Sequence, residues 1–197
     1  MRILAIATIL AAQVGAAPMT TTDREHLVAH LEMTESWLAD EVSGLTDAQL
    51  RFRPAPGKWT ILDVVEHLTI AEPQYWRDLK DSMAKPPAAA KNRDAADLYV
   101  LWYGIDRTEH QKTAEAREPK GTLTDALAGM AAIHKLRAEM LAYARATDED
   151  LRGHTYGGGD VYQWFVMIST HMQRHILQIR EVKASAGYPK ASPQAPR

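Results

Sequence analysis

The sequence predicts an all-α fold, a four-helix bundle. Four long stretches of the 197-residue chain repeat apolar residues every three or four positions, the period of a helix with one buried face. Loops with proline or glycine separate these stretches, and few segments alternate in the manner of a β-strand. A composition of 46% hydrophobic and 24% charged residues is typical of one globular domain with a core.

The first predicted helix covers residues 22–45 and begins at a capping box, Thr22–Glu25. The second covers residues 60–83, and its first turn, Thr60–Asp63, has an approximate form of the same box. Pro73 falls inside this helix, where it removes one backbone hydrogen bond and clashes with the preceding turn. We therefore expect a kink or a break there.

Residues 94–116 have helical character, but apolar residues follow one another directly and Gly104 interrupts them. The third long helix covers residues 124–147, with Thr124 as its cap. The fourth begins at Asp160, after a loop with three consecutive glycines. These four long helices are enough to enclose a bundle core.

The N-terminus, residues 1–17, has the three parts of a secretory signal peptide, with cleavage expected after Ala16. We expect an exported protein, periplasmic or secreted, with no membrane segment in its mature form. If translation begins at Met19 instead, the protein is cytoplasmic. After this N-terminal segment, we expect one helical domain over residues 18–186 and a disordered tail over residues 187–197.

Charge and cysteine content exclude several classes of function. The chain has 23 Lys and Arg against 25 Asp and Glu, a net charge of −2, so no basic excess favours nucleic acid as a partner. It has no cysteine, which excludes disulfides, cysteine–metal sites and thiol nucleophiles, so the ligands of any bound metal are His, Asp or Glu. Five tryptophans are interpreted as packing residues rather than a stacking platform: Trp37, Trp59, Trp76, Trp102 and Trp164.

Three of the eight histidines are candidates for a metal site. His171 and His175 lie four residues apart on the fourth helix, so both imidazoles project from one side and continue its apolar stripe. His67 borders the buried face of the second helix, and it reaches a similar depth if the two helices run antiparallel. The same pattern is also compatible with histidines that are hydrogen-bonded in a core without a metal.

The other five histidines are interpreted as ordinary residues. His26 and His30 share the spacing of four, but they lie at the edge of the first helix's stripe and are expected at the surface. His110 and His134 stand among charged residues, and His154 lies in the glycine-rich loop.

Two segments resemble the signatures of the DinB-like superfamily of helical bacterial proteins: PAPGKWTILDVVEHL at 54–68 and THMQRHILQI at 170–179. The resemblance covers the whole predicted domain. It implies a four-helix bundle, often dimeric, in which His67, His171 and His175 bind one divalent ion (zinc, nickel or iron). It also implies an activity on a small molecule, since the superfamily includes thiol-dependent transferases, isomerases and members regarded as hydrolases.

Three neutral imidazoles leave at least one metal position open for water, which predicts a metal-dependent hydrolase. The signal peptide disfavours the alternative of a thiol-dependent transferase, because those members work in the cytosol. A non-catalytic metal-binding or stress-associated protein is a further alternative. No general base is assigned: Glu66 is expected to face away from His67, whereas Glu72 and Asp63 are candidate acceptors for ligand N–H groups. Tyr75 is a candidate hydrogen-bond donor, and residues 94–122 are expected to shape access.

Overall fold

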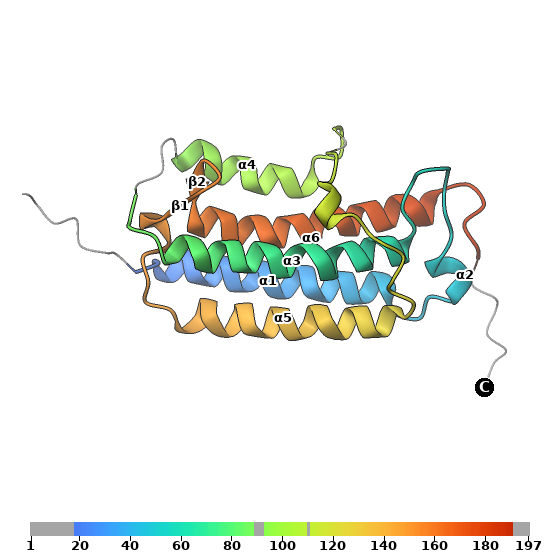
Figure 1. Cartoon of the computed structure of the whole chain (residues 1–197), viewed down its shortest axis with the longest axis horizontal. Helices are drawn as coiled ribbons and strands as arrows, with labels where there is room; N and C mark the ends of the chain where they lie inside the picture. Colours follow the sequence, from blue (N-terminus) through green and yellow to red (C-terminus); the bar gives the residue numbers. More distant parts are fainter. Residues whose placement is uncertain (1–17, 89–92, 110, 191–197) are drawn as a thin grey trace, which may run out of the picture.

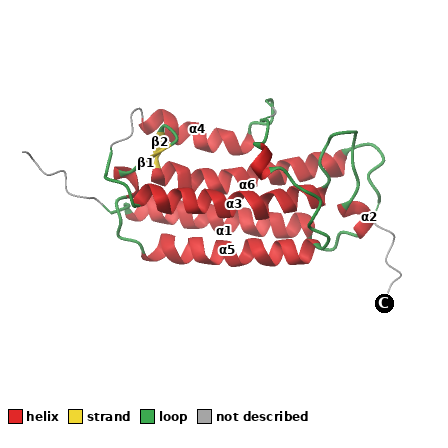
Figure 2. Ribbon diagram, in the orientation of Figure 1, coloured by secondary structure: helices red, strands yellow, loops and turns green. Residues whose placement is uncertain are grey.

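The computed structural model describes residues 18–88, 93–109 and 111–190. It confirms the four-helix bundle (Figures 1 and 2). The long helices are α1 (Thr21–Val42), α3 (Ile61–Met83), α5 (Ala126–Ala146) and α6 (Val161–Ala184).

Shorter elements connect the long helices. The loop from α1 to α3 contains α2 (Asp47–Leu50), and the connection from α3 to α5 contains α4 (Arg93–Ile105) and the 3-10 turn η1 (Glu115–Arg117). A second turn, η2 (Leu151–Gly153), precedes a small antiparallel hairpin of β1 (Thr155–Tyr156) and β2 (Gly159–Asp160) that leads into α6.

The order of the helices in space determines which side chains can meet. α6 packs between α1 and α3, and α5 packs on the other side of the same two helices. α3 and α5 run in the same direction, antiparallel to α1 and α6, because α4 carries the chain back along α6 before α5 begins (Figure 1). The antiparallel contact of α3 with α6 is the arrangement that brings His67 to the level of the histidine pair.

Capping predictions for the second and fourth long helices are confirmed. Thr60 and Asp63 form a complete capping box, in which the Thr60 amide donates to Asp63 at 2.8 Å and the Asp63 amide donates to Thr60 at 3.0 Å. Asp160 forms the equivalent box with Gln163 at the start of α6. Both helices that carry the candidate ligands therefore have fixed starting points.

The other two predicted caps are wrong by a few residues. The cap of α1 is Thr20 rather than Thr22, because the Thr20 hydroxyl accepts a bond from the Asp23 amide at 3.0 Å. The cap of α5 is Asp125 rather than its neighbour Thr124. In each case several residues of capping type lie close together, and the cap is the one whose side chain accepts a hydrogen bond from an amide of the first turn.

The sequence predicts a kink or a break at Pro73. Helix α3 continues through Pro73 to Met83, which excludes the break. Trp76 and Leu79, one and two turns later, are buried in the core. Their burial against the neighbouring helices outweighs the cost of proline inside a helix, about 3 kcal/mol.

The packing role predicted for the tryptophans holds for Trp76, which is buried, and for the half-buried Trp164. It is wrong for Trp102, whose exposed fraction is 61%, because α4 packs on α6 and leaves its outer face uncovered. Trp37 is at the margin of exposure, and Trp59 lies at the candidate site. The exposed apolar residues of α4 are Leu98, Tyr99, Leu101, Trp102 and Ile105.

Three predictions fall on residues outside the described ranges: the signal peptide at 1–17, the end of the tail at 191–197, and His110. The described start of the tail packs against the α2 region. Tyr188 meets the Phe52 ring edge-on, with centroids 5.5 Å apart, and the Gln49 amide donates to the Pro189 carbonyl at 3.0 Å. None of the described helices is long and apolar enough to cross a membrane.

Candidate metal centre

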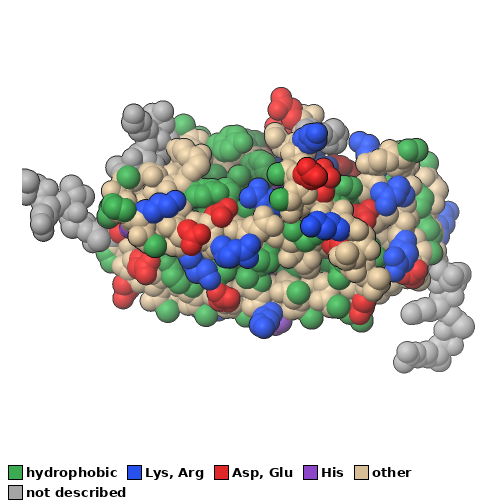
Figure 3. Space-filling view, viewed as in Figure 1, with side chains coloured by type: hydrophobic (Ala, Val, Ile, Leu, Met, Phe, Trp, Pro, Cys, Tyr) green, Lys and Arg blue, Asp and Glu red, His purple; other side chains and the backbone are tan. Residues whose placement is uncertain are grey.

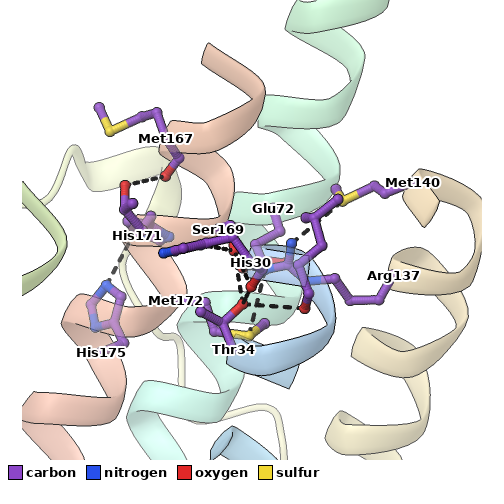
Figure 4. Close-up of polar contacts among 12 residues, drawn as sticks. His30, Thr34, Glu72, Arg137, Met140, Met167, Ser169, His171, Met172 and His175 are labelled. Atoms are coloured by element: carbon purple, nitrogen blue, oxygen red, sulfur yellow. Dashed lines mark hydrogen bonds and ion pairs between the residues drawn. The ribbon is translucent and has the colours of Figure 1, made fainter. Parts of the chain in front are cut away.

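The three predicted histidines lie together in the buried interface of α3 and α6. Nε2 of His171 is 3.2 Å from Nε2 of His67 and 3.1 Å from Nε2 of His175. All three side chains are buried, and one nitrogen from each lies within 4.8 Å of the others. His171 and His175 come from adjacent turns of α6 (Figure 4), whereas His67 comes from the antiparallel α3.

Hydrogen bonds at the far side of two rings determine which nitrogen carries the proton. Nδ1 of His67 lies 2.7 Å from the backbone carbonyl oxygen of Arg117, and Nδ1 of His175 lies 2.9 Å from Oε1 of Gln178. A carbonyl oxygen only accepts hydrogen bonds, so each Nδ1 is the donor. Nε2 of both rings therefore carries a lone pair directed at the common centre.

This arrangement suits a bound cation. Lone pairs that converge at 3.1–3.2 Å repel each other unless a proton or a metal ion lies among them. Two nitrogens bound to a tetrahedral zinc ion are about 3.3 Å apart, given metal–nitrogen distances of about 2.0–2.1 Å. Nδ1 of His171 is buried and has no partner among the described residues. The donor set and its spacing thus fit a divalent metal.

The pKa values of all three histidines are below the ordinary value. Burial is the largest cause in each case. The neighbouring histidines lower the pKa of His171 further, and His67 does the same for His175. The hydrogen bond to the Arg117 carbonyl raises the pKa of His67, whereas the charge of Arg117 lowers it. The rings are therefore neutral at neutral pH, the form in which imidazole binds metals.

Aromatic rings cover the triad. The Trp59 ring lies 5.0 Å from the His67 ring and is stacked on His175 at 6.1 Å with an interplanar angle of 15°. Tyr75 meets His171 edge-on, with centroids 5.1 Å apart. The sequence predicted Trp59 only as a packing residue, although its position just before the second helix was a usable signal.

Neither predicted carboxylate acceptor reaches a ligand histidine. Asp63 caps α3 and pairs with Arg53 at 3.0 Å, and Glu72 pairs with Arg137 in the core. The acceptors are instead the Arg117 carbonyl and Gln178. Gln178 was detectable from its spacing of three after His175. Arg117 was not, because it belongs to a turn 50 residues from His67 in sequence.

Glu66 faces away from the triad, as predicted, but it is buried and holds the chain that follows η1. Its carboxylate accepts bonds from the Gly121 amide at 2.8 Å, the Thr122 amide at 2.9 Å and the Thr122 hydroxyl at 2.6 Å. Burial by itself raises the pKa of Glu66, but the bonds from Thr122 and Gly121 lower it below its usual value. Glu66 thereby ties α3 to the segment that supplies the Arg117 carbonyl.

We expect Glu66→Gln to destabilise the protein by about 1–3 kcal/mol, because an amide offers one acceptor oxygen to donors that now share two. Urea unfolding measures this loss. Glu25→Gln, a change at an exposed position of α1, is the matched control and should leave the unfolding free energy unchanged. Equal stability of the Glu66 and Glu25 variants would show that the loop is held by other contacts.

A buried ion pair lies next to the triad, on the side of α6 that faces the bundle core. Nη2 of Arg137 is 3.0 Å from Oε1 of Glu72, and both side chains are completely buried. The same Nη2 lies 3.5 Å from the sulfur of Met172, the residue after His171 (Figure 4). Oε2 of Glu72 has no partner among the described residues. Burial raises the pKa of Glu72 to about 7, although Arg137 opposes the shift.

His30 is half-buried, so its predicted surface position is wrong. Its Nδ1 lies 2.7 Å from the Ser169 hydroxyl, which is also 2.8 Å from the Thr34 hydroxyl (Figure 4). The cause is the close contact of α1 with α6, which covers the edge of the stripe. His26 is exposed, as predicted.

The remaining described histidines also match their predictions. His134 is exposed and pairs with Glu35 at 2.6 Å, and His154 lies in the loop before β1. Neither joins the candidate metal group.

The triad opens into a cavity of about 540 Å³. α4 and the segment that follows it form one wall, with Tyr99, Tyr103 and Lys112 among the lining residues. The prediction that residues 94–122 shape access to the site is therefore confirmed. Trp59 and Tyr75 contribute to the lining beside the histidines.

Comparison with known families decides the classification. The family model described as the DinB superfamily matches residues 27–179, more than half of the chain. The chain belongs to the DinB superfamily. The matched DinB region includes all three histidines of the candidate centre.

Two similar proteins come from Bacillus subtilis. The uncharacterised protein YuaE of strain 168 is 26% identical over 154 residues, which cover 76% of this chain and 91% of YuaE. The structure of YfiT superposes with a TM-score of 0.55 at 19% identity, over 84% of this chain and 88% of YfiT. YfiT is described as "a probable metal-dependent hydrolase with an unusual four-helix bundle topology". At this identity, the likeness to YfiT shows the shared fold.

Proposed function

We propose that this DinB-superfamily protein is a metal-dependent hydrolase that holds one divalent ion with His67, His171 and His175. The observation that carries the proposal is the position of three converging imidazole nitrogens at an open cavity. The description of YfiT as a probable metal-dependent hydrolase supports it.

The ligand set favours catalysis over a structural metal site. Within residues 18–88, 93–109 and 111–190, no fourth His, Asp or Glu joins the three histidines. Structural zinc sites have four protein ligands, whereas catalytic sites keep a position open. A divalent ion bound by neutral histidines retains its charge, polarises a carbonyl or phosphoryl oxygen and acidifies water.

The protein's own residues orient the ligands for this role. The Arg117 carbonyl and Gln178 each hold one histidine in the tautomer that presents Nε2 to the centre. Trp59 covers His67 and His175 and limits the directions from which a substrate approaches. In hydrolysis, the oxygen of water bonds to the electrophilic carbon or phosphorus atom, and the leaving group departs with a proton.

The test uses protein purified without a histidine tag, stripped with a chelator and reconstituted with zinc, nickel or iron(II). We expect one ion per chain and turnover of at least one member of a panel of carboxylic esters, amides, lactones and phosphoesters. Activity should disappear on chelation and return with the metal. His134→Ala, which removes an exposed histidine, is the matched control and should leave metal content and turnover unchanged.

The other outcomes separate the alternatives. Stoichiometric metal without hydrolysis of any panel member would contradict the proposal and favour a non-catalytic metal-binding protein. Metal-dependent transfer of an added low-molecular-weight thiol to an electrophile, without hydrolysis, would favour the thiol transferase. Absence of metal after reconstitution would favour the interpretation of the three histidines as hydrogen-bonded core residues that bind no metal.

A further inference from the structure

We infer that the cavity at the triad binds a small molecule with an anionic group, a carboxylate or a phosphate, next to a planar apolar part. That the cavity is a substrate site follows from the proposed function, on which this inference rests. The class of substrate follows from the charged and aromatic side chains that line the cavity.

The lining has an excess of positive charge. Its described residues include five cationic side chains and one acid, Glu118. The cationic residues are Lys58, Arg107, Lys112, Arg117 and Arg174. The chain as a whole has a net charge of −2, so this excess is a local property of the cavity. On the face that Figure 3 shows, blue and red side chains are interspersed.

Three of the cationic residues are committed to structural contacts. Arg107 forms a bidentate pair with Glu181, at 2.9 and 2.8 Å. Arg117 lies over the Tyr75 ring and donates to Gln74. Arg174 is buried and donates to backbone carbonyls of residues 103, 106 and 109, and among the described residues no carboxylate accepts a bond from it. Its charge adds to the field of the cavity and, in addition to the hydrogen bonds from Thr108, lowers the pKa of the nearby Asp106 carboxyl.

Two lysines are free to meet a ligand. Lys58 and Lys112 are exposed, and in the described part of the chain neither has an ion-pair partner. Lys58 directly precedes Trp59, whose ring contacts two of the histidines, and Lys112 belongs to the segment between α4 and η1. They therefore carry charge from two separate loops to one cavity. Such lysines attract anions and place them at the mouth of the site.

The positive charges lie in the same cavity as the histidines. Arg107, Arg117 and Arg174 line it together with the triad. A bound divalent ion adds two more positive charges to this region. A neutral or cationic substrate leaves this charge uncompensated, whereas an anionic one offsets it.

Aromatic side chains supply the surface for a planar group. Trp59, Tyr75, Tyr99 and Tyr103 line the same cavity as the lysines. Tyr99 is 61% exposed, and its ring lies 6.5 Å from that of Tyr103. Rings arranged around a cavity favour stacking or edge contacts with a flat apolar group.

The experiment compares benzoate with benzamide, which have the same ring and nearly the same shape but differ in charge. Calorimetric titration of the metal-free protein removes any direct bond from the carboxylate to a metal. We expect benzoate to bind roughly tenfold more tightly than benzamide at low ionic strength, with the difference shrinking as salt is added. The Lys58→Gln, Lys112→Gln double variant should reduce benzoate affinity roughly fivefold and leave benzamide unchanged.

Lys135→Gln, an exposed lysine on α5 outside the lining, is the matched control and should change neither ligand. All the substituted lysines are exposed, so the variants should fold, and circular dichroism checks this. Equal affinities for benzoate and benzamide in the metal-free protein would overturn the inference. A preference for benzoate that appears only after zinc is added, and that the lysine variants leave unchanged, would also overturn it, because the metal alone would then bind the anion. In that last case the proposed hydrolase function still stands.

Discussion

Replacing His171 by alanine is expected to weaken binding of the divalent metal by at least about 100-fold, because loss of a mere hydrogen-bond partner of a ligand already costs about 10–100-fold. His171 is the central member of the triad, with its Nε2 within 3.2 Å of both other Nε2 atoms. Competition with a chromophoric chelator measures the dissociation constant in tag-free protein.

Two further variants serve as references for the loss of metal affinity in His171→Ala. His26→Ala removes an exposed histidine that, like His171, is followed four residues later by another histidine, and it should leave metal affinity unchanged. Gln178→Ala removes only the acceptor of His175 Nδ1, so we expect an intermediate loss of about 10–100-fold. Metal affinity that is the same in His171→Ala as in wild type would show that the ion binds elsewhere, and the ligand assignment would fail.

Arg137→Ala is expected to destabilise the fold by about 3–5 kcal/mol, because it leaves the Glu72 carboxylate buried without its cation. Urea unfolding of the metal-free protein measures the effect. The matched control is Arg145→Ala on the same helix, which removes an exposed ion pair with Glu32 and should cost less than about 1 kcal/mol. A joint replacement, Glu72→Leu with Arg137→Met, should recover most of the loss, since it removes both buried charges.

The pH dependence distinguishes an uncompensated charge from a simple cavity. The pKa of folded Glu72 is about 7, above its ordinary value of 4.5, so between these values the folded state holds more protons than the unfolded state. The contribution of Glu72 to stability is therefore present at low pH and declines as pH rises through 7. Arg137 lowers the pKa of Glu72, so in Arg137→Ala this pKa is higher and stability continues to fall at higher pH. The loss of stability in Arg137→Ala should therefore be larger at about pH 8 than at about pH 5. A loss that is independent of pH would indicate that only packing volume matters.

Local sequence patterns were sufficient for the helices and for two of the three candidate ligands. The pair His171 and His175 is a property of one helix, since a spacing of four places both rings on one side whatever the rest of the chain does. The Thr60–Asp63 box likewise depends on residues three apart, and it formed as predicted. Where capping residues adjoin, as at Thr20 and Thr22, the pattern identified the helix but not its first residue.

Contacts across the bundle were beyond local patterns. The prediction of a kink or a break at Pro73 allowed for a break because it ignored the packing of α3 between α5 and α6. The surface position predicted for His30 ignored the approach of Ser169 from α6. Glu72 was considered as an acceptor for a ligand histidine because its partner Arg137, 65 residues away, was not foreseeable. Each error concerns a residue whose environment is supplied by a distant segment.

The sequence by itself determined the helical bundle, the absence of thiol ligands, and the candidate histidines of the metal centre, because periodicity, composition and i, i+4 spacing are local properties. Only the tertiary structure decided that His67 meets the pair and that the Arg117 carbonyl orients its ring. It also decided that two lysines from separate loops, neither with an ion-pair partner among the residues that the structure describes, share the cavity. These features depend on the antiparallel contact of α3 with α6 and on the course of the chain through α4, which bring together residues far apart in the sequence.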